Sequence, residues 1–242
     1  MFPKTKLDPS WQDQVNAVCK AYRDAKRLYE TTGLRTISVD EQTGIQALQR
    51  IAPDRLVKSG LCARREYEYT RHGVTCLFGN LDVVTGNILA PMLSEYRKDE
   101  DFLRNIKNVI ATDPTAPWRF VLDKLNIQMS ECLVQFVADA CNLEDDLGSK
   151  RKRQGILSTL TTRKAFLSDQ THRIHFVYTP KHCSWLNQIE MWFGTLRRKM
   201  TRLNSFDSLN ALKTQILRFI DYYNRTMAHP YRWTYEGKLL CK

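Results

Sequence analysis

The segment between residues 174 and 200 constrains the fold most, because a short apolar run is followed there by a segment with helical periodicity. Ile174 to Tyr178 is rich in β-branched and aromatic residues, which predicts a buried strand, and Pro180 ends it. Ser184 is the expected N-cap of the following long helix. One apolar stripe at helical spacing runs along that helix, formed by Trp185, Ile189, Trp192, Phe193, Leu196 and Met200.

Glu190 lies at the border of this stripe, one turn from Leu186 and two turns from Arg197. A carboxylate beside two tryptophans costs free energy unless a cation, hydrogen bonds or a metal accompanies it. Taken alone, Glu190 is best interpreted as a helix-edge residue paired with an arginine. Two other acids in the chain favour a metal ligand instead.

These two acids each end a segment that reads as a buried strand. Residues 35–40 (RTISVD) end on Asp40, and residues 118–123 (WRFVLD) end on Asp123. With right-handed crossovers the two strands can lie parallel and adjacent. Asp40 and Asp123 would then emerge at the same edge of the sheet, where Glu190 enters from the helix after the last strand.

The remaining segments alternate between strand and helix patterns, which favours an α/β fold with a mixed sheet covered by helices on both faces. The first strand is expected to continue through 45–49 past a bend at Gly44, and 73–83 with 87–92 is expected to form a hairpin. Helices are expected over 10–30, 99–111, 131–141 and 206–223, surface loops or short helices over 51–66 and 144–164, and an irregular tail over 229–233.

The net charge of +11 and the pI near 9.4 suit a polyanionic partner. Basic residues cluster at 150–153, at 163–164 and at 197–199 with Arg202. Any one such cluster is usually a solvated surface. Several in the C-terminal half favour a nucleic acid, without separating DNA from RNA.

Other features of the sequence point to a soluble, cytoplasmic protein. No apolar run approaches the length of a membrane span, and the N-terminus lacks the apolar core of a signal peptide. The seven cysteines form no CxxC pair, which predicts reduced thiols. His172 and His175 are interpreted as strand-edge residues in preference to metal ligands, because no cysteine pair accompanies them.

Three converging acids would raise one another's pKa values, and divalent cations remove that penalty. Hard oxygen ligands favour Mg²⁺ or Mn²⁺. Two such ions can activate a water or a 3′-hydroxyl and stabilise the leaving oxygen of an in-line phosphoryl transfer. The acids and the positive charge therefore predict metal-dependent chemistry on a phosphodiester backbone.

Several segments resemble the bacterial insertion-sequence transposases of the mariner-related branch of the DDE superfamily. The resemblance is carried by SVDEQTGIQALQR (38–50), DPTAPWRFVLDKLN (113–126), YTPKHCSWLNQIEMWFGTLRRK (178–199) and FIDYYNRTMAHPYRWTY (219–235). It implies an RNase H-like catalytic domain over 34–242, with sheet order 3-2-1-4-5, after a helical lead-in over 1–33. It also implies that Asp40, Asp123 and Glu190 are the catalytic, metal-binding acids.

The resemblance further implies double-stranded DNA as partner, both transposon ends and target, and a homodimer associated with the bacterial nucleoid. His182, Ser184, Trp185 and Asn187 match the family block before the glutamate, where they would shape the corner and contact DNA; for Trp185, pure packing is an equal alternative. The expected nucleic-acid contacts are Lys124, Lys181, His182, Ser184, Asn187, Arg197, Arg198 and Lys199.

The chain departs from the family at two points. Lys124 stands where family members usually carry asparagine, and Ile127-Gln128-Met129 stands where a histidine usually follows. The usual N-terminal helix-turn-helix region, of about a hundred residues, is expected to be absent. Two alternatives to a DNA-cleaving and strand-transferring enzyme therefore stay open, namely a transposase fragment that only binds DNA and an RNase H-type nuclease acting on RNA–DNA hybrids.

Overall fold

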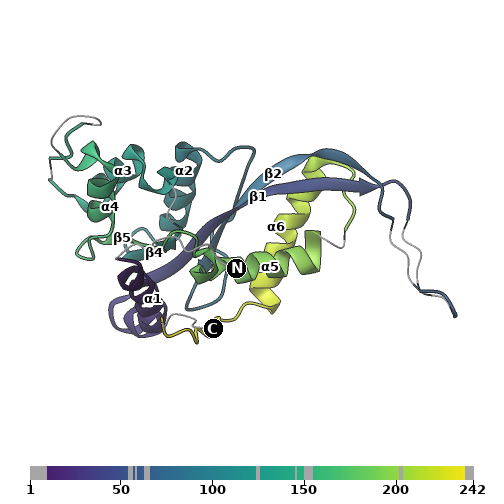
Figure 1. Cartoon of the computed structure of the whole chain (residues 1–242), viewed down its shortest axis with the longest axis horizontal. Coiled ribbons are helices and arrows are strands. Elements are labelled where there is room, and N and C mark those ends of the chain that lie inside the picture. Colours follow the sequence, from purple (N-terminus) through teal and green to yellow (C-terminus); the bar gives the residue numbers. More distant parts are fainter. Residues whose placement is uncertain are drawn as a thin grey trace.

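A computed structural model describes residues 10–53, 57, 59–62, 66–123, 126–144, 146–149, 155–201 and 204–237. Its strands form one mixed sheet in the order β3-β2-β1-β4-β5, which confirms the predicted order and fold class (Figure 1). The strands are β1 (Arg35–Arg50), β2 (Tyr69–Asp82), β3 (Met92–Ser94), β4 (Trp118–Leu122) and β5 (Ile174–Tyr178).

The strand pairing divides the sheet into an antiparallel half and a parallel half. β1 pairs antiparallel with β2, and β2 with β3. β1 pairs parallel with β4, and β4 with β5. The expected parallel placement of β1 beside β4 is therefore confirmed.

The expected hairpin over 73–83 and 87–92 is only partly present. Beyond the turn after β2, a single bridge joins Leu81 to Ile88. The chain then turns away at Ala90, whose φ is 39°, and pairs again with β2 only in β3. The long hairpin of this protein is instead formed by β1 and β2.

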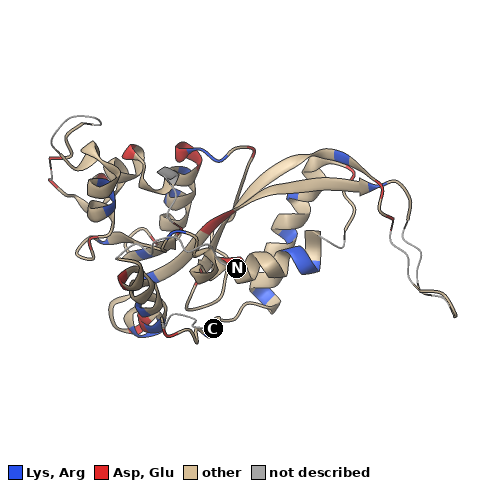
Figure 2. Ribbon diagram, in the orientation of Figure 1, with Lys and Arg blue, Asp and Glu red and all other residues tan. Residues whose placement is uncertain are grey.

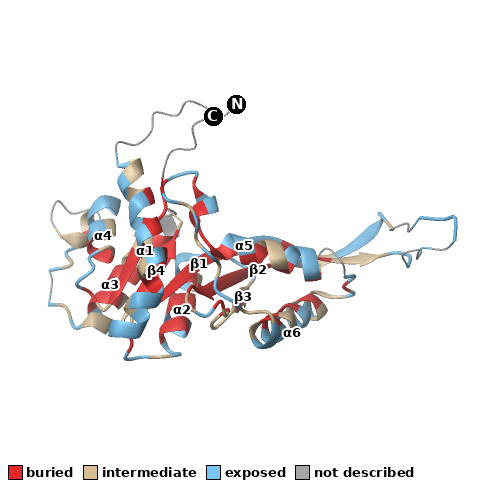
Figure 3. Cartoon of the chain, turned by 90° about the horizontal axis from the view of Figure 1, so that it is seen from below, coloured by how far each residue is buried: buried red, intermediate tan, exposed pale blue. Residues whose placement is uncertain are grey.

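Helices cover both faces of the sheet. One face carries α2 (Asp99–Ile110), α3 (Glu131–Cys141) and α4 (Leu160–Leu167), and the other carries α1 (Trp11–Thr32), α5 (Ile189–Leu196) and α6 (Leu209–Thr226) (Figures 1 and 3). Single turns lie between them, which are η1 (Asn126–Met129), η2 (Ile156–Ser158), η3 (Ser184–Leu186) and the π-helical η4 (Arg197–Thr201). No helix in the described ranges is long and apolar enough to span a bilayer.

A bulge in β1 changes which face its side chains occupy. Before the bulge, Ile37 and Val39 pack in the core beneath α2 and α3. Register shifts between Gln42 and Ile45, next to Gly44 in a left-handed conformation, insert an extra residue. Ile45 and Ala47 consequently face α5 and α6. The strand continues past Gly44, as the sequence predicted.

The start of the helix after β5 differs from the prediction. Ser184 begins the short turn η3, whereas α5 begins only at Ile189 with Gln188 as N-cap. Trp185 lies on this turn, is 48% exposed and is not part of the apolar stripe. The other stripe residues are buried, as expected. The separate turn allows the polar corner to reach the sheet before the helix starts.

Gly79 of β2 pairs with Asp40 of β1 in the strand register, and its lack of a side chain lets α5 approach the sheet at this level. A Cβ at Gly79 would lie 2.9 Å from the ring of Phe193. We expect Gly79→Ala to lower the free energy of unfolding by about 1–3 kcal/mol, because the ring has to shift in a packed core. Urea denaturation measures this loss.

Gly194→Ala is the matched control, because its nearest neighbour would be the flexible end of Arg198 at 3.5 Å. This change should be neutral or stabilising by up to about 1 kcal/mol, since alanine favours helix. Equal destabilisation by both variants would contradict the proposed close approach of α5 to β2.

Candidate active site

The parallel pairing of β1 and β4 brings Asp40 and Asp123 side by side. Ser38 and Val121 are partners in the register of these strands, and each acid lies two residues further along its chain. Val121 faces the α1 side of the sheet, as does Ser38, which contacts the residues before α5. Because side chains alternate along a strand, Asp40 and Asp123 belong to that same face. The adjacency expected from the sequence is confirmed.

Glu190 reaches this edge because the chain before it is bonded to β1. The side-chain amide of Asn187 donates to the Val39 carbonyl at 2.9 Å, and its oxygen accepts a hydrogen bond from the Ser38 hydroxyl. The Ile189 backbone N–H donates to the Ser38 oxygen at 2.9 Å. These bonds fix the first turn of α5, and with it Glu190, beside the end of β1.

Asn187 is therefore not the exposed DNA contact that the sequence suggested. It is fully buried, and its polar groups are used within the protein. Its observed place agrees with the other role expected for it, which is shaping the corner. Ser38, its main partner, was missed as a site residue, although it shares the polar face of β1 with Asp40.

Thr179 is a second residue that the sequence did not single out. Its hydroxyl donates to the Asp123 carboxylate at 3.0 Å, and its backbone N–H donates to the Leu122 carbonyl at 2.8 Å. The end of β5 therefore orients Asp123 from the side opposite β1. Its position directly after a buried strand was the only signal in the sequence.

The electrostatics of the three acids are coupled. Burial, and after it the nearby carboxylates of Asp123, Glu41 and Glu190, together raise the pKa of Asp40 to about 8. Burial also raises the pKa of Asp123, while the Thr179 hydrogen bond opposes this. The pKa of Glu190 is raised by burial and by Asp123 and lowered by Arg197. The acids are thus close enough to disfavour one another's ionisation.

Glu41, directly after Asp40, is a further acid at this end of β1. It is 9% exposed, and neither of its carboxylate oxygens has a hydrogen-bond partner within the described structure. Burial raises its pKa to about 7, and Arg97 opposes the shift. The Gln128 side chain also lowers this pKa, but the net shift is upward, so burial costs the ionised form of Glu41 more than these two neighbours return.

The donor set suits a divalent cation, because carboxylate oxygens are the ligands that Mg²⁺ and Mn²⁺ prefer. Asp40 and Asp123 each use one oxygen in a hydrogen bond, to the Glu41 N–H and the Thr179 hydroxyl. Within the described ranges, no three His, Cys, Asp or Glu side chains stand close enough to hold an ion as they are. Sharing an ion would therefore require the carboxylates to move together.

Comparison with known families agrees with this geometry. Residues 35–213 match the model of the DDE superfamily endonuclease family, a range that contains all three acids and all five strands of the sheet. The chain belongs to the DDE superfamily endonuclease family. No curated protein sequence matches it.

Two solved structures show the fold of this DDE-family chain. The crystal structure of the Mos1 mariner paired-end complex with Mn has a TM-score of 0.53 at 12% identity, and the Mos1 transposase paired-end complex with the left transposon end has 0.51 at 12%. Each covers 93% of this chain, whereas this chain spans 58% of each Mos1 chain. The RNase H-like sheet is therefore shared with a DDE transposase.

The expected DNA-contacting residues of the DDE-family chain, other than Asn187, are exposed wherever they are described. Lys181, His182 and Ser184 lie on the corner between β5 and η3, and His182 adopts a left-handed φ of 62°. At the far end of α5, the exposed residues are Arg197, Arg198 and Lys199. Lys124 lies outside the described residues.

Figure 2 marks a basic stretch directly after α5 and an acidic stretch within β1. Arg197 reaches the Gln42 side chain of β1 at 3.5 Å and acts on the pKa of Glu190. Residues 150–153 and 202 of the expected basic clusters lie outside the described residues. Arg163 is buried and bonded to the carbonyls of Met129 and Thr159, so it is not part of a solvated basic patch.

His172 and His175 are buried, and no metal cluster forms around them within the described ranges. His175 lies in β5, where burial lowers its pKa to about 4, and its Nδ1 contacts the His172 carbonyl at 3.3 Å. His172 packs its ring on Phe166. Both therefore belong to the core of the DDE-family domain.

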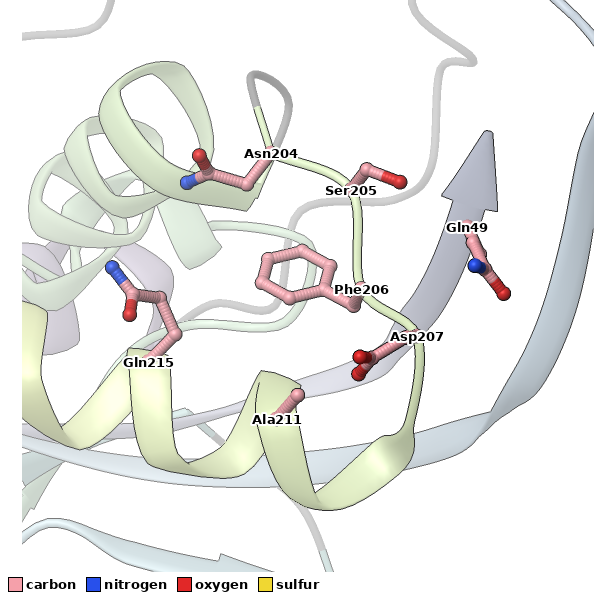
Figure 4. A pocket seen from close by; sticks show the side chains of 7 residues that line it. All are labelled: Gln49, Asn204, Ser205, Phe206, Asp207, Ala211 and Gln215. Carbon is pink, nitrogen blue, oxygen red and sulfur yellow. The ribbon is translucent and has the colours of Figure 1, made fainter. Parts of the chain in front are cut away.

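A pocket of about 420 Å³ lies at the other end of β1, away from the three acids. Figure 4 shows its lining, in which Phe206 is central and the side chains of Asn204 and Gln215 surround it. Asp207 is the only acid among the lining residues, so the donor set that a divalent cation needs is missing there. Asp40, Asp123 and Glu190 therefore match the needs of a divalent cation better than the lining of this pocket does.

Asn187→Ala tests the structural role of this asparagine. The change removes the amide that donates to the buried Val39 carbonyl and the oxygen that accepts from the Ser38 hydroxyl, so the free energy of unfolding should fall by about 2–4 kcal/mol. Chemical denaturation measures the loss. The salt dependence of DNA binding should stay unchanged, because no phosphate contact is removed.

Lys181→Ala is the matched control on the exposed corner, and its effects should be reversed. Stability should change by less than about 0.5 kcal/mol, whereas the salt dependence of binding should weaken. If Asn187→Ala kept its stability and weakened DNA binding as Lys181→Ala does, the direct-contact interpretation would be right after all.

Proposed function

We propose that this chain cleaves transposon ends and joins them to target DNA, with Asp40, Asp123 and Glu190 as the catalytic, metal-binding acids. The observation that carries the proposal is the pairing of Ser38 with Val121, which sets two acids side by side. The bonds from Asn187 and Ile189 to β1 bring Glu190 to the same edge. Membership of the DDE superfamily endonuclease family supports the same reaction class.

Each acid has a distinct support within the protein. Asp40 is held by β1 and by the N–H of Glu41, and Asp123 is oriented by Thr179. Glu190 is the most exposed of the three and follows the corner that precedes α5. Asp40 is buried, Asp123 is partly buried and Glu190 is exposed, which leaves an open side through which a phosphodiester can approach.

Two Mg²⁺ or Mn²⁺ ions would activate a water or a 3′-hydroxyl and stabilise the leaving oxygen of an in-line displacement. The Mos1 mariner paired-end complex was solved with Mn, which supports divalent metal as the cofactor here. The protein contributes three carboxylates whose mutual repulsion is relieved when they are neutralised.

We infer that double-stranded DNA is the partner, because exposed basic residues flank the acids on both sides. Lys181 and His182 precede Glu190, and Arg197 to Lys199 follow it. Such residues neutralise phosphates and position the backbone without reading sequence. The proposal includes a homodimer associated with the bacterial nucleoid, with residues 34–242 as the catalytic domain.

The proposal is tested by incubating the protein with Mn²⁺ and three substrates: supercoiled plasmid, duplex DNA carrying the element's own ends, and an RNA–DNA hybrid. We expect nicking of duplex DNA and joining of the end-bearing duplex to plasmid. Preferential cleavage of the hybrid would instead support the RNase H-type alternative.

A DNA-binding fragment without chemistry is the second candidate, favoured by the separation of the acids in the described structure. It predicts salt-dependent DNA binding together with no cleavage of any substrate and no saturable Mn²⁺ binding. Calorimetric titration with Mn²⁺ distinguishes it from the enzyme.

A further inference from the structure

The C-terminal segment 228–237 crosses the molecule on the side of the proposed site. Figure 1 shows it, in yellow, running from the end of α6 towards α1. It passes the turn after β2 so closely that a Cβ on Gly86 would lie 2.1 Å from the backbone oxygen of His229. Further along, the Gly237 carbonyl accepts a hydrogen bond from the Gln12 side chain of α1. The segment is thus held at both ends.

Side chains along this segment alternate between two environments. Tyr231, Trp233 and Tyr235 are partly buried, whereas Arg232 and Thr234 are exposed. Such a period of two is that of an extended chain with one face against the protein. The inward face is therefore a row of aromatic residues.

Tyr235 contacts the corner before Glu190 directly, and Trp233 reaches it through Tyr22. The ring of Trp233 lies 4.7 Å from that of Tyr22 in α1, and the Tyr22 hydroxyl accepts a hydrogen bond from the Gln188 N–H at 3.3 Å. The ring of Tyr235 meets Trp185 of η3 edge-on at 5.0 Å. The segment therefore acts on both ends of the stretch 185–188.

The position of this stretch determines where Glu190 lies. The Glu190 N–H donates to the Asn187 carbonyl at 3.1 Å, so the first turn of α5 grows directly out of the corner. On the sheet side, Asn187 fixes the corner to β1. On the outer side, Tyr22 and Tyr235 contact it, and Leu186 packs among the buried apolar residues of α1.

We propose that Trp233 and Tyr235 are positioning residues, which clamp the corner 185–188 and thereby hold Glu190 towards Asp40 and Asp123. The inference rests on the proposed function only for its catalytic consequence, since the clamp itself is a matter of packing. Aromatic pairs of this kind favour a particular relative orientation of the two rings, and they stabilise it beyond the effect of the area that they bury.

Trp233→Ala in the full chain tests the clamp by hydrogen–deuterium exchange. We expect the amides of residues 185–190 to exchange at least about tenfold faster, because the corner opens locally, while the amides of β1 and β4 stay protected. Binding of Mn²⁺, measured by calorimetry, should weaken about tenfold, as for residues that orient metal ligands. Trp233→Phe should restore both values, and Thr234→Ala, on the outward face, should change neither.

Tyr22→Phe is a second variant for the case that Trp233→Ala loses its global fold. It removes only the hydroxyl that accepts from Gln188, and faster exchange is expected at that amide alone. Unchanged exchange over 185–190 in either folded variant would overturn the clamp. Faster exchange in a protein whose parent form binds no Mn²⁺ would keep the clamp and refute the proposed metal site.

Discussion

Asp123→Asn is expected to abolish Mn²⁺-dependent nicking of duplex DNA while the protein stays folded. The carboxamide keeps the size of the side chain and can still accept a hydrogen bond from Thr179, the contact seen at 3.0 Å. It removes a negative charge from the set that would bind the cations. Loss of about 4 kcal/mol of transition-state stabilisation corresponds to a rate lowered about a thousandfold.

The nicking rate on supercoiled plasmid measures this effect, with circular dichroism as the check on folding. Thr179→Val is the matched control, because it removes only the hydrogen bond that orients Asp123, so a partial loss of rate is expected. Nicking at the parent rate by folded Asp123→Asn, and likewise by folded Asp40→Asn and Glu190→Gln, would exclude these acids from the reaction.

Asp40→Asn is expected to stabilise the protein at pH 8 in the absence of divalent cations. Folded Asp40 keeps its proton up to a pKa of about 8, whereas the unfolded chain releases it near the ordinary value of 3.8. Between these values the folded state binds more protons, so the free energy of unfolding falls as the pH rises. An asparagine avoids this loss, and we expect a gain of about 2–4 kcal/mol at pH 8.

Chemical denaturation at pH 5 and pH 8, with and without Mn²⁺, measures the effect. The stability gain of Asp40→Asn should be smaller at pH 5, because the free energy of unfolding of the parent protein has by then fallen by only part of its total decrease. With Mn²⁺ the parent protein should be stabilised more than the variant, because the cation binds the ionised carboxylate. A variant less stable than the parent at pH 8 without metal would show that Asp40 is ionised and compensated in the fold.

Some of the site could be predicted from the sequence because its signals are local. Asp40 and Asp123 each follow a buried apolar run, and a parallel sheet brings such ends to one edge. The period of the segment after residue 188 correctly predicted which side chains α5 buries. The alternation of strand and helix patterns predicted a mixed sheet covered by helices, whereas the strand order was implied by the resemblance to the DDE transposases.

Other parts depended on contacts between distant residues. The family resemblance implied that Asn187 shapes the corner and contacts DNA, and only its bonds to Ser38 and Val39 show that it fixes α5 to the sheet. Those same bonds make the corner before Glu190 a separate turn. The sequence alone therefore placed the start of the helix at Ser184, which in fact begins this turn. Similarly, the apolar run after Gly86 suggested a strand, but the chain leaves β2 at Ala90.

The sequence also could not show, along the whole of β1, on which side of the sheet each side chain lies. The bulge next to Gly44 shifts the alternation, so that Ile45 faces α5 and α6 whereas Val39 faces α2. Glu41 was overlooked because an acid beside another acid usually lies at the surface, whereas here it is buried without a partner. Its environment is set by β2 and by the chain around Gln128, which are far from it in the sequence.

Anomalous diffraction from a crystal grown with Mn²⁺ is the most direct measurement of whether these acids share a metal. We expect a peak in contact with carboxylate oxygens of both Asp40 and Asp123, with Glu190 drawn towards it from the first turn of α5. A saturated crystal with no peak at this edge of the sheet, or with Glu190 turned away from a bound ion, would contradict the proposed site.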